Sequence, residues 1–551
     1  RVAATRPTRP NVPDGVVVVD PHSSRPLIAS SSPWSALRLP AFRAIWLASL
    51  VSNIGTWMQS ASAAWMMTSL STSPVLVALM QTASSLPFFL LALPSGALAD
   101  IVDRRRVLLA TQAWMAAAAA VLGVLTLRGM VDAWSLLGLT FLLGVGAALS
   151  APAFQALIPE LVPRADLSSA VALGSVSMNV ARAVGPALGG LLLAAHATGL
   201  VFLLNAASFL AVIVVVLTIR ATVRESTLPP ERVIGAMIAG ARFVRHSPPL
   251  RGVLAHSAAF TLTGSALWAL LPVVARRDLG LGGVGYGLLL TCLGGGAIAG
   301  AWLLPILRRR VGSDRVLIGA TLGFAAASAA LGLAHNLPVI AVAMVGAGVA
   351  WMAGMSTLNV AAQQAAPAWV RARALAVSLL VIQGGLAVGS LAAGALAERL
   401  GTPRALSVFA VAMVIGGVLT VRRRLHGLDD LDLTPSEPRP APVLPADLDP
   451  EEVPVLVTVE YDIAPADAAA FVVAASALER IRRRDGAIEW GLYRDAERAS
   501  RFVETFYVPS WLEHLRQHER ITVADRLVEG QVRAFQRGEA PIITHLLGTR
   551  P

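Results

Sequence analysis

Several residues of this 551-residue chain recur at one fixed spacing. The recurring residues are Gly96, Arg104–Arg106, Gly185 and Gly190 in the first copy and Gly300, Arg308–Arg310, Gly389 and Gly394 in the second. Each residue of the second copy lies 204 positions after its counterpart. Because two separate segments keep the same offset, the sequence indicates an internal duplication. Duplicated halves, with a site between them that opens alternately to either side, are the plan of many secondary transporters.

The composition places most of the chain in a lipid bilayer. Mean hydropathy is +0.65, 55% of the residues are hydrophobic and 14% are charged, whereas soluble domains carry about 25% charged residues. A net charge of +11 raises nucleic acid as a partner, but the arginines lie between apolar runs, where topology signals explain them better. We therefore expect a bilayer and no nucleic acid. The single cysteine, Cys292, excludes an intrachain disulfide framework.

Apolar runs of roughly 20 residues, the length that crosses a bilayer, follow one another from about residue 42 to 422. We predict twelve spans, near 43–68, 75–99, 106–128, 134–156, 169–195, 199–219, 251–274, 284–307, 315–334, 337–361, 372–397 and 403–421. The predicted domains are a flexible tail at 1–41, six-helix halves at 42–219 and 251–422, an inter-half loop at 220–250, a linker at 423–452 and a small domain at 453–551.

Arginine clusters mark alternate loops between these spans. Examples are Arg104–Arg106, Arg308–Arg310 and Arg422–Arg424, whereas the loop at 69–74 carries no charge. The exceptions are Arg276, Arg277, Arg399 and Arg404. Since cytoplasmic loops carry the excess of arginine and lysine, we predict that both termini lie in the cytoplasm.

Residues 453–551 have the character of a small soluble domain. We predict strands at 453–462, 487–494, 501–508 and 542–547, a helix at 466–484, and a second helical stretch, open to a break, from 510 to about 535. The order β-α-β-β-α-β is that of a ferredoxin-like sandwich. The predicted fold class is an all-α polytopic membrane protein of twelve transmembrane helices in two halves, followed by a small α+β ferredoxin-like domain.

The stretch that closes the second predicted span carries a recognisable signature. It resembles the loop motif G-x-L-x-D-x-x-G-R-[KR] of the major facilitator superfamily, which it matches at Gly96, Leu98, Asp100, Arg104 and Arg105. Asp103 stands where the motif has its second Gly, so the turn there is expected to differ. The resemblance implies that Asp100, Arg104 and Arg105 form a gate. The alternative is that the arginines only anchor topology.

A second motif lies inside the fifth predicted span. It is Gly-Pro-x-x-Gly-Gly, formed by Gly185, Pro186, Gly189 and Gly190, and it resembles the fifth-helix motif of exporters in the same superfamily. Proline removes a backbone donor, and glycines permit a bend and a close helix crossing.

Arg182 lies near the middle of the same span. An ionisable group at that depth is by default a functional hypothesis. We expect Arg182 to meet an anionic substrate group or a coupling carboxylate. The alternative is a pairing with backbone carbonyls or with an acidic side chain of a neighbouring helix.

Further segments resemble one branch of the superfamily. They are Phe42-Arg43, Ser52–Gln59, Ser73-Pro74, Pro152–Glu160 and Asn179 with Arg182. On these residues the chain looks like the enterobactin-exporter-like branch, which comprises bacterial exporters of siderophores and drugs. The resemblance covers most of 34–422. It implies proton-driven export of a small amphipathic or anionic compound by alternating access, across a bacterial inner membrane.

Polar side chains within the spans are candidate substrate contacts. Besides Arg182 we choose Asn179, Gln59, Gln363 and Gln383. Each of these amides is also a candidate for an interhelical hydrogen bond. No predicted span has a central Asp or Glu, so the residue that would carry the proton is not identified.

The soluble domain is rich in aromatic and histidine side chains. We predict a pocket formed by Trp490, Tyr493, Trp511, His514 and His518. His514 and His518 share a helix face, but the Glu that follows the first His in zinc proteases is absent, so the pattern alone is weak as a zinc site. We expect no metal and no cofactor.

The domain resembles the antibiotic-biosynthesis-monooxygenase type in element order and in aromatic and histidine content. This implies ligand sensing, or dimerisation through the domain. The sequence leaves a second class of function open, a membrane-anchored sensor or monooxygenase-like protein whose spans supply ligand to the tail. We expect a transporter and not an enzyme, with a small-molecule substrate and the proton as coupling ion.

Overall fold

The computed structural model describes residues 34–219, 233–367, 369–423, 425, 432–434, 436, 449 and 451–548. Within helices, the side chains of 92–93, 96–101 and 233–238 are outside this description, as is that of 164. Residues 1–33 of the predicted flexible tail and most of the predicted linker at 423–452 also lie outside these ranges.

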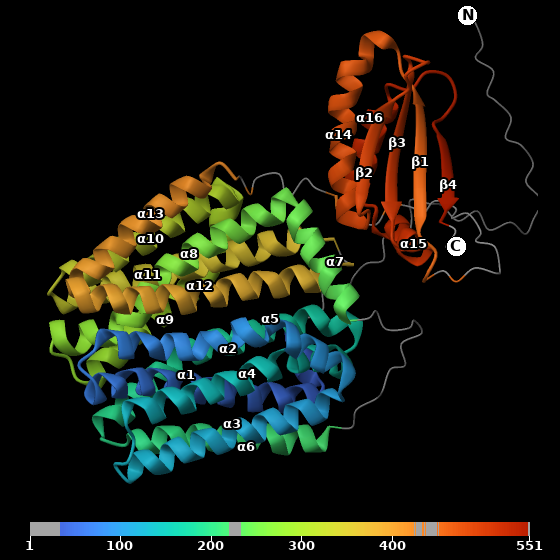
Figure 1. Cartoon of the computed structure of the whole chain (residues 1–551). Helices are drawn as coiled ribbons and strands as arrows, with labels where there is room; N and C mark the ends of the chain where they lie inside the picture. The colour runs from blue at the N-terminus through green and yellow to red at the C-terminus, as the bar shows by residue number, and fades with distance from the viewer. Residues whose placement is uncertain are drawn as a thin grey trace, which may run out of the picture.

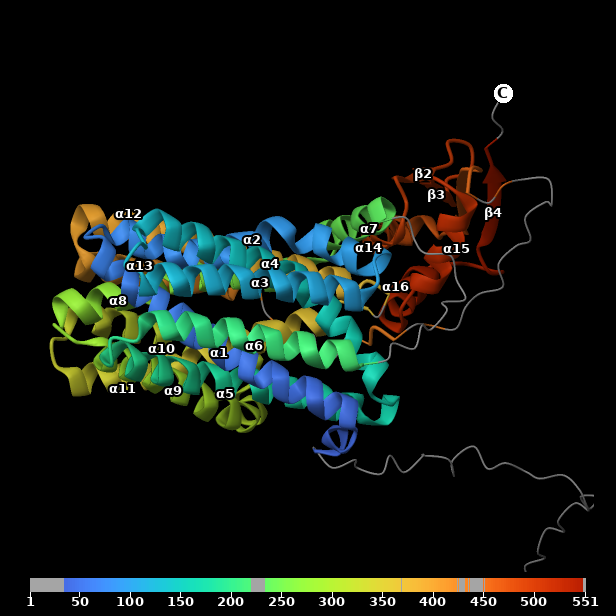
Figure 2. The same cartoon turned by 90° about the horizontal axis from the view of Figure 1, so that it is seen from below.

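Long helices form a bundle, and the described part of the chain contains twelve of them (Figures 1 and 2). In the first half they are α1 (Pro40–Leu70), α2 (Pro74–Ile101), α3 (Arg104–Leu127), α4 (Ala133–Leu161), α5 (Leu167–Ala194) and α6 (Thr198–Thr218). In the second half they are α8 (Pro248–Val273), α9 (Gly283–Val311), α10 (Ser313–Leu333), α11 (Leu337–Gln364), α12 (Arg371–Leu400) and α13 (Thr402–Val421). The predicted two sets of six helices are confirmed.

Eleven of the described helices are both long and apolar enough to cross a membrane. α1 is the long helix outside that group, although its 31 residues exceed the length needed. The reason is its composition, since α1 carries Asn53, Gln59 and a series of hydroxyl side chains. Many of its polar residues face other helices, where hydrogen bonds and small side chains permit close packing.

A short helix, α7 (Val233–His246), lies in the segment that was predicted as the inter-half loop. It lies at the end of the bundle that also carries the C-terminal domain (Figure 1). We call this the tail end of the bundle and the opposite end the far end. Successive long helices run in opposite directions, so Arg104–Arg106 and Arg308–Arg310 both lie at the tail end.

The internal duplication is visible in how the helices of each half pack. Gly185 of α5 packs against Trp57 of α1, the first long helix of its own half. Its copy, Gly389 of α12, packs against Leu262 of α8, the first long helix of the second half. In both places the added Cβ of a larger residue would collide with the neighbouring helix, which explains why glycine occupies both copies.

The second recurring glycine joins the two halves. Gly190 of α5 lies against Gly287 of α9, and its copy Gly394 of α12 lies against Ala78 of α2. A Cβ on Gly190 would lie 2.9 Å from the Cα of Gly287, and one on Gly394 would lie 2.6 Å from the Cβ of Ala78. The two contacts are therefore related by the same duplication. One joins α5 to α9 and the other joins α12 to α2, so both hold the two halves together at the far end.

Polar contacts reinforce this closure. The Glu398 carboxylate, near the end of α12, accepts a hydrogen bond from Ser73 Oγ (2.6 Å) at the start of α2, where the helix dipole favours a negative charge. Arg276 donates to Thr68 Oγ1 (3.2 Å), and Arg277 donates to a carbonyl oxygen of the α1–α2 loop (3.3 Å). Two of the arginines that broke the loop pattern thus link the halves at the far end.

The C-terminal domain contains a four-stranded antiparallel sheet with strand order β2-β3-β1-β4. Its elements are β1 (Val455–Asp462), α14 (Ala468–Asp485), β2 (Glu489–Arg494), β3 (Arg501–Val508), α15 (Trp511–Arg520), α16 (Val523–Arg533) and β4 (Ile542–Leu547). The helices pack on one face of the sheet around a shared apolar core. The predicted order of elements is confirmed, and the second helical stretch breaks between α15 and α16.

Local signals set the helix ends of this domain. α14 ends at Asp485, and Gly486 follows it with φ 145°, a conformation that favours glycine. The helix predicted at 466–484 therefore ends within one residue of its predicted boundary. Ser510 caps α15, since its side chain accepts a hydrogen bond from the backbone N–H of Glu513 (3.2 Å).

Candidate functional site

Arg182 of α5 is half-buried and lies at the end of a series of aromatic rings that begins in its own half. Its guanidinium carbon is 5.2 Å from the ring centroid of Trp57 in α1. Trp57 lies 6.3 Å, centroid to centroid, from Trp268 of α8, and Trp268 meets Trp351 of α11 edge-on at 5.6 Å. These four side chains form a row, which we call the aromatic row, that crosses from the first half to the second.

Polar atoms at this row lack protein partners. Nε of Arg182 and Nε1 of Trp268 are buried and have no hydrogen-bond partner within the described residues. Contact with an indole face stabilises a guanidinium by about 0.5–2 kcal/mol. That offsets only part of the cost of burying the cation. The row can therefore accept an anionic group at Arg182 and stack a planar group on tryptophan.

Two of the predicted amide contacts have partners elsewhere. Gln59 is buried, and its Oε1 accepts a hydrogen bond from Asn205 Nδ2 of α6 (2.6 Å). Gln363 is exposed near the end of α11, where its Nε2 donates to Asn359 Oδ1 of the same helix (3.3 Å). The first pairing is an interhelical hydrogen bond inside the first half, which was the alternative that the sequence left open.

The other two predicted amides lie in the middle portions of their helices. Asn179 is half-buried one turn before Arg182 on α5, and Gln383 is half-buried on α12. Gly384, next to Gln383, packs against Phe89 of α2 in the other half. Gln383 therefore belongs to a stretch of α12 that meets the opposite half.

The predicted gate falls partly outside the described residues. The backbone of Gly96, Leu98 and Asp100 belongs to α2, but their side chains lie outside the part that the structure describes. Arg104 forms an ion pair with Glu160 near the end of α4. Arg105 donates to the carbonyl oxygen of Leu217 near the end of α6 (2.5 Å). These two arginines hold helix ends together within the first half.

Asp103 has a specific role in the turn where the signature has glycine. Its carboxylate accepts a hydrogen bond from the backbone N–H of Arg106 (2.9 Å) and caps α3. In the second copy, Arg308 donates to the carbonyl oxygen of Ser356 in α11 (3.2 Å). Arg104 and Arg308 therefore each contact the fourth long helix of their own half.

The C-terminal domain contacts the bundle through α7 and the turn before α12. Arg242 of α7 forms an ion pair with Glu513 of α15 (2.7 Å), and Arg520 shares that carboxylate (2.7 Å). The Arg520 guanidinium also lies 4.7 Å from the ring centroid of Trp369, which meets the buried Phe243 of α7 edge-on at 5.7 Å. Burial opposes ionisation of Glu513, but Arg520 and Arg242 hold its pKa below the usual range.

The predicted pocket of the C-terminal domain divides into two groups. Trp490 of β2 donates from Nε1 to the buried Glu504 carboxylate (3.0 Å) and belongs to the interior. Tyr493 is 62% exposed on the same strand. Trp490 and Tyr493 therefore lie on opposite faces of the sheet, because successive residues of a strand point to alternate sides.

The remaining predicted residues do lie together. Trp511 and His514 of α15 have ring centroids 5.6 Å apart, and His514 and His518 have centroids 4.7 Å apart. His545 of β4 joins them at 4.9 Å from His514, and it was absent from the predicted pocket. Burial, His518 and His545 lower the pKa of His514 to about 4, so its imidazole is neutral at neutral pH.

Comparison with known proteins agrees with this architecture. The chain matches the family model described as "Transmembrane secretion effector" (MFS_3) over residues 31–551, a range that includes the C-terminal domain. It is 23% identical over 365 residues to the staphyloferrin A transporter of Staphylococcus aureus, covering 66% of this chain and 90% of that protein. It is 25% identical over 401 residues to the multidrug efflux pump Tap of Mycolicibacterium fortuitum (71% and 96%). It is 27% identical over 327 residues to the enterobactin exporter EntS of Shigella boydii (58% and 76%).

Solved structures show the same fold. A bacterial homologue of the human lysosomal transporter Spinster, inward-facing and unoccupied, superposes with a TM-score of 0.56 at 15% identity, covering 70% of this chain and 96% of that one. A bacterial homologue of the iron transporter ferroportin, also inward-facing, gives 0.54 at 18% identity, covering 70% and 98%. The predicted resemblance to the major facilitator superfamily is confirmed. This chain is a multi-span membrane transporter of that superfamily and belongs to the family described as transmembrane secretion effector.

Proposed function

We propose that this transporter exports a small amphipathic or anionic compound of the siderophore or drug class, by proton-coupled alternating access. The relatives named above include a siderophore transporter, a siderophore exporter and a multidrug efflux pump. The observation that carries the proposal is the placement of Arg182 over Trp57, in a row of rings that spans both halves.

The chemistry of the aromatic row favours an anionic ligand with planar groups. A guanidinium presents a rigid fork of N–H donors that matches carboxylate-like oxygens, and its orphaned Nε at Arg182 is one such donor. The indoles of Trp57 and Trp268 offer faces and edges for ring stacking. Because the row joins the two halves, the contacts of a ligand bound there would change when the halves move relative to one another.

Export as the direction of transport rests on the similarity to exporters, and topology assigns each end of the bundle to one side of the membrane. If the arginine-rich tail end faces the cytoplasm, both termini are cytoplasmic and the far end faces outward across a bacterial inner membrane. The contacts Gly190–Gly287 and Glu398–Ser73 then close the outer side. Export would require these contacts to separate after the ligand has bound at Arg182. The tail would serve as a sensing or pairing module docked on the cytoplasmic end, and the proposal assigns the chain no catalytic step.

Inside-out vesicles with a preset acidic interior test the proposal. Candidate siderophores and hydrophobic drugs are added, and release of protons from the vesicles is followed with a pH-sensitive dye. We expect substrate-triggered release with the wild-type protein and a loss of at least about tenfold in Arg182→Ala, because the anion loses its charged partner. Arg310→Ala is the matched control, since Arg310 is an exposed arginine at the tail end.

Two results would contradict the proposal. Wild-type transport in Arg182→Ala, with normal membrane insertion, would remove Arg182 from the substrate site. Absence of proton release with every compound of both classes, in vesicles shown to contain folded protein, would overturn proton-coupled export of these classes.

A further inference from the structure

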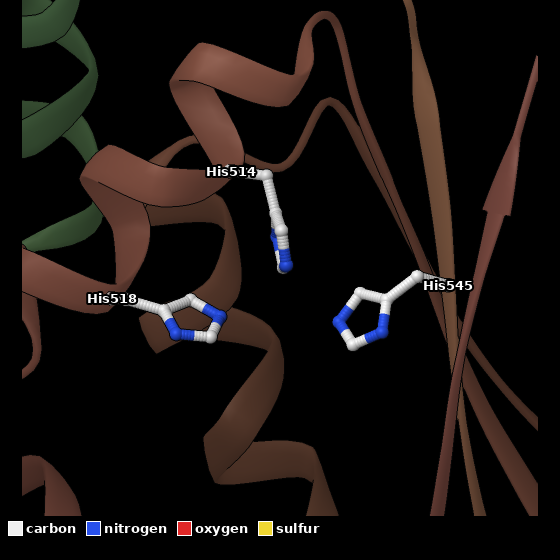
Figure 3. Close-up of side chains that lie close together, drawn as sticks. All are labelled: His514, His518 and His545. Atoms are coloured by element: carbon white, nitrogen blue, oxygen red, sulfur yellow. The ribbon is translucent and has the colours of Figure 1, made fainter. Parts of the chain in front are cut away.

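Three histidines of the C-terminal domain converge from two elements that are distant in sequence. His514 and His518 lie one turn apart on α15, and His545 lies on β4. Each residue offers a ring nitrogen that lies within 4.8 Å of those of the other two. Figure 3 shows the three rings around a common space, with a nitrogen of His518 and one of His545 directed into it. The sequence pattern alone did not favour a metal here, because the pair of His514 and His518 lacks the Glu that follows the first His in zinc proteases.

The sheet register explains how the third histidine arrives. His545 pairs with Val457 of the neighbouring strand β1, and Val457 is buried in the core of the domain. Residues that are directly paired across a sheet point to the same face. His545 therefore points toward the helix layer, where α15 presents His514 and His518.

His514 is oriented as a metal-bound histidine usually is. It is 2% exposed, and its Nδ1 lies 3.3 Å from Gln517 Oε1, so a proton on Nδ1 can be donated to that amide oxygen. Nε2 is then the nitrogen with the free lone pair, and it is buried without a hydrogen-bond partner. Leaving a buried polar atom unsatisfied costs about 1–3 kcal/mol. Metal ligands commonly have the other ring nitrogen held by such a second interaction.

We propose that His514, His518 and His545 bind one divalent transition-metal ion of the Zn²⁺ class. Imidazole ligands suit Zn²⁺, Co²⁺, Ni²⁺ and Cu²⁺, whereas Mg²⁺ and Ca²⁺ require oxygen ligands. Zn–N bonds of about 2.0–2.1 Å place two nitrogens of a tetrahedron about 3.4 Å apart. The observed separations are at most 4.8 Å. Small side-chain rotations would shorten them to the tetrahedral value. Three protein ligands leave a fourth position for water or for another ligand.

The competing interpretation is an aromatic cluster that only packs the core. Trp511 supports it, with ring centroids 5.6 Å from His514 and 6.1 Å from His545. Packing does not account for the unsatisfied Nε2 of the buried His514. A metal ion at the common space satisfies that atom and uses both elements that converge there.

The position of the site links it to the transporter. The same helix α15 carries Glu513 and Arg520, which contact Arg242 and Trp369 at the tail end of the bundle. An ion bound to His514, His518 and His545 would tie α15 to β4. The helix that docks the domain on the bundle would then be held in one position.

The test uses the full-length protein purified with a tag free of histidine and stripped with a chelator. Co²⁺ is titrated as a spectroscopic probe, because its visible absorption reports tetrahedral nitrogen coordination. Zn²⁺ is then added as competitor, and bound metal is counted by plasma mass spectrometry. We expect one ion per chain, a tetrahedral Co²⁺ spectrum, and displacement of Co²⁺ by Zn²⁺.

Two ligand variants and one control decide the outcome. His518→Ala and His545→Ala are each expected to weaken Co²⁺ binding by at least about tenfold, whereas His335→Ala, at an exposed loop histidine of the bundle, should bind as wild type. Circular dichroism and thermal melting without metal establish that each variant is folded. Absence of Co²⁺ and Zn²⁺ binding by the wild-type protein at micromolar concentration would overturn the proposal. Equal binding by the wild type and both folded variants would also overturn it.

Discussion

Gly190 of α5 and Gly287 of α9 face one another so closely that a Cβ on either would lie 2.9 Å from the Cα of the other. The two residues belong to different halves, so this contact is a seam and not part of the packing of one half. A seam of small residues lets two helix backbones approach in a bilayer, where van der Waals contact drives association. Closure of the far end therefore depends on the absence of side chains at these positions.

We predict that Gly190→Leu prevents closure of the far end and lowers transport at least about tenfold, since overpacking a tight contact costs on the order of 1–3 kcal/mol. Substrate-triggered proton release from inside-out vesicles measures the effect. Gly174→Leu is the matched control, because Gly174 lies on the same helix and a Cβ there would meet nothing within 4 Å. Equal transport by the two variants would show that the seam does not limit the cycle.

Glu398 offers a milder change at the same end. We expect Glu398→Gln to weaken the contact with Ser73 Oγ by about 0.5–1.5 kcal/mol, because a charge-assisted hydrogen bond becomes a neutral one. The far end should then open more often. Alkylation of a cysteine placed at Val77, which is buried one turn after Ser73 on α2, in a Cys292→Ser background should be roughly two- to tenfold faster in Glu398→Gln.

The control for this prediction is Arg399→Gln, which changes the charge of the adjacent exposed residue. An equal increase in alkylation rate for both variants would point to a general electrostatic effect. No change in Glu398→Gln would mean that the carboxylate does not help to hold the far end closed.

The recurring glycines show what the sequence could predict and why. Where two helices touch this closely, only glycine fits. The recurrence of a glycine at a fixed offset therefore predicts a close contact even before the partner residue is known. Gly185 and Gly389 accordingly pack on corresponding helices, and Gly190 and Gly394 both meet the opposite half. The partners themselves, such as Gly287, could not be predicted, because they depend on how helices from different halves are rotated.

The polar residues follow a different logic. Whether an amide lines a cavity or bonds to a neighbouring helix depends on the direction in which its helix faces, which mean hydropathy does not report. Gln59 thus pairs with Asn205, and α1 packs within the bundle although its composition is not apolar enough to identify it as a membrane span. His545 joins His514 only because β4 pairs with β1, a long-range register that local patterns do not determine.

No local sequence pattern indicated that the C-terminal domain docks on the bundle. The contact between them gives a further prediction. Glu513 neutralises both Arg242 and Arg520 at the contact with α7. Removing the shared carboxylate from this partly buried group leaves two arginines without their acceptor, at a cost of about 1–3 kcal/mol. We expect Glu513→Gln to release α15 from α7 and to raise hydrogen–deuterium exchange in both helices. Glu519→Gln, at an exposed residue of the same helix, should leave exchange unchanged.

If exchange in Glu513→Gln stayed at the wild-type level in α7 while the domain remained folded, the ion pair would not be what holds the domain to the bundle. The stacking of Arg520 on Trp369 would then be the next contact to remove.

The buried pair of Gln59 and Asn205 separates a structural role from a substrate role. Asn205 Nδ2 donates to Gln59 Oε1 at 2.6 Å, and Gly55 of α1 leaves room for the side chain of Asn205. We expect Gln59→Leu and Asn205→Leu each to lower stability by about 1–3 kcal/mol, because each leaves one buried amide unsatisfied. The double variant should be less destabilised than the sum of the two single variants, since neither amide then remains.

Thermal melting in detergent measures the stability of these variants, and a ligand-binding titration measures their affinity for substrate. An unchanged affinity together with this non-additive melting would assign Gln59 to helix packing, whereas a loss of affinity in Gln59→Leu but not in Asn205→Leu would return it to the substrate site.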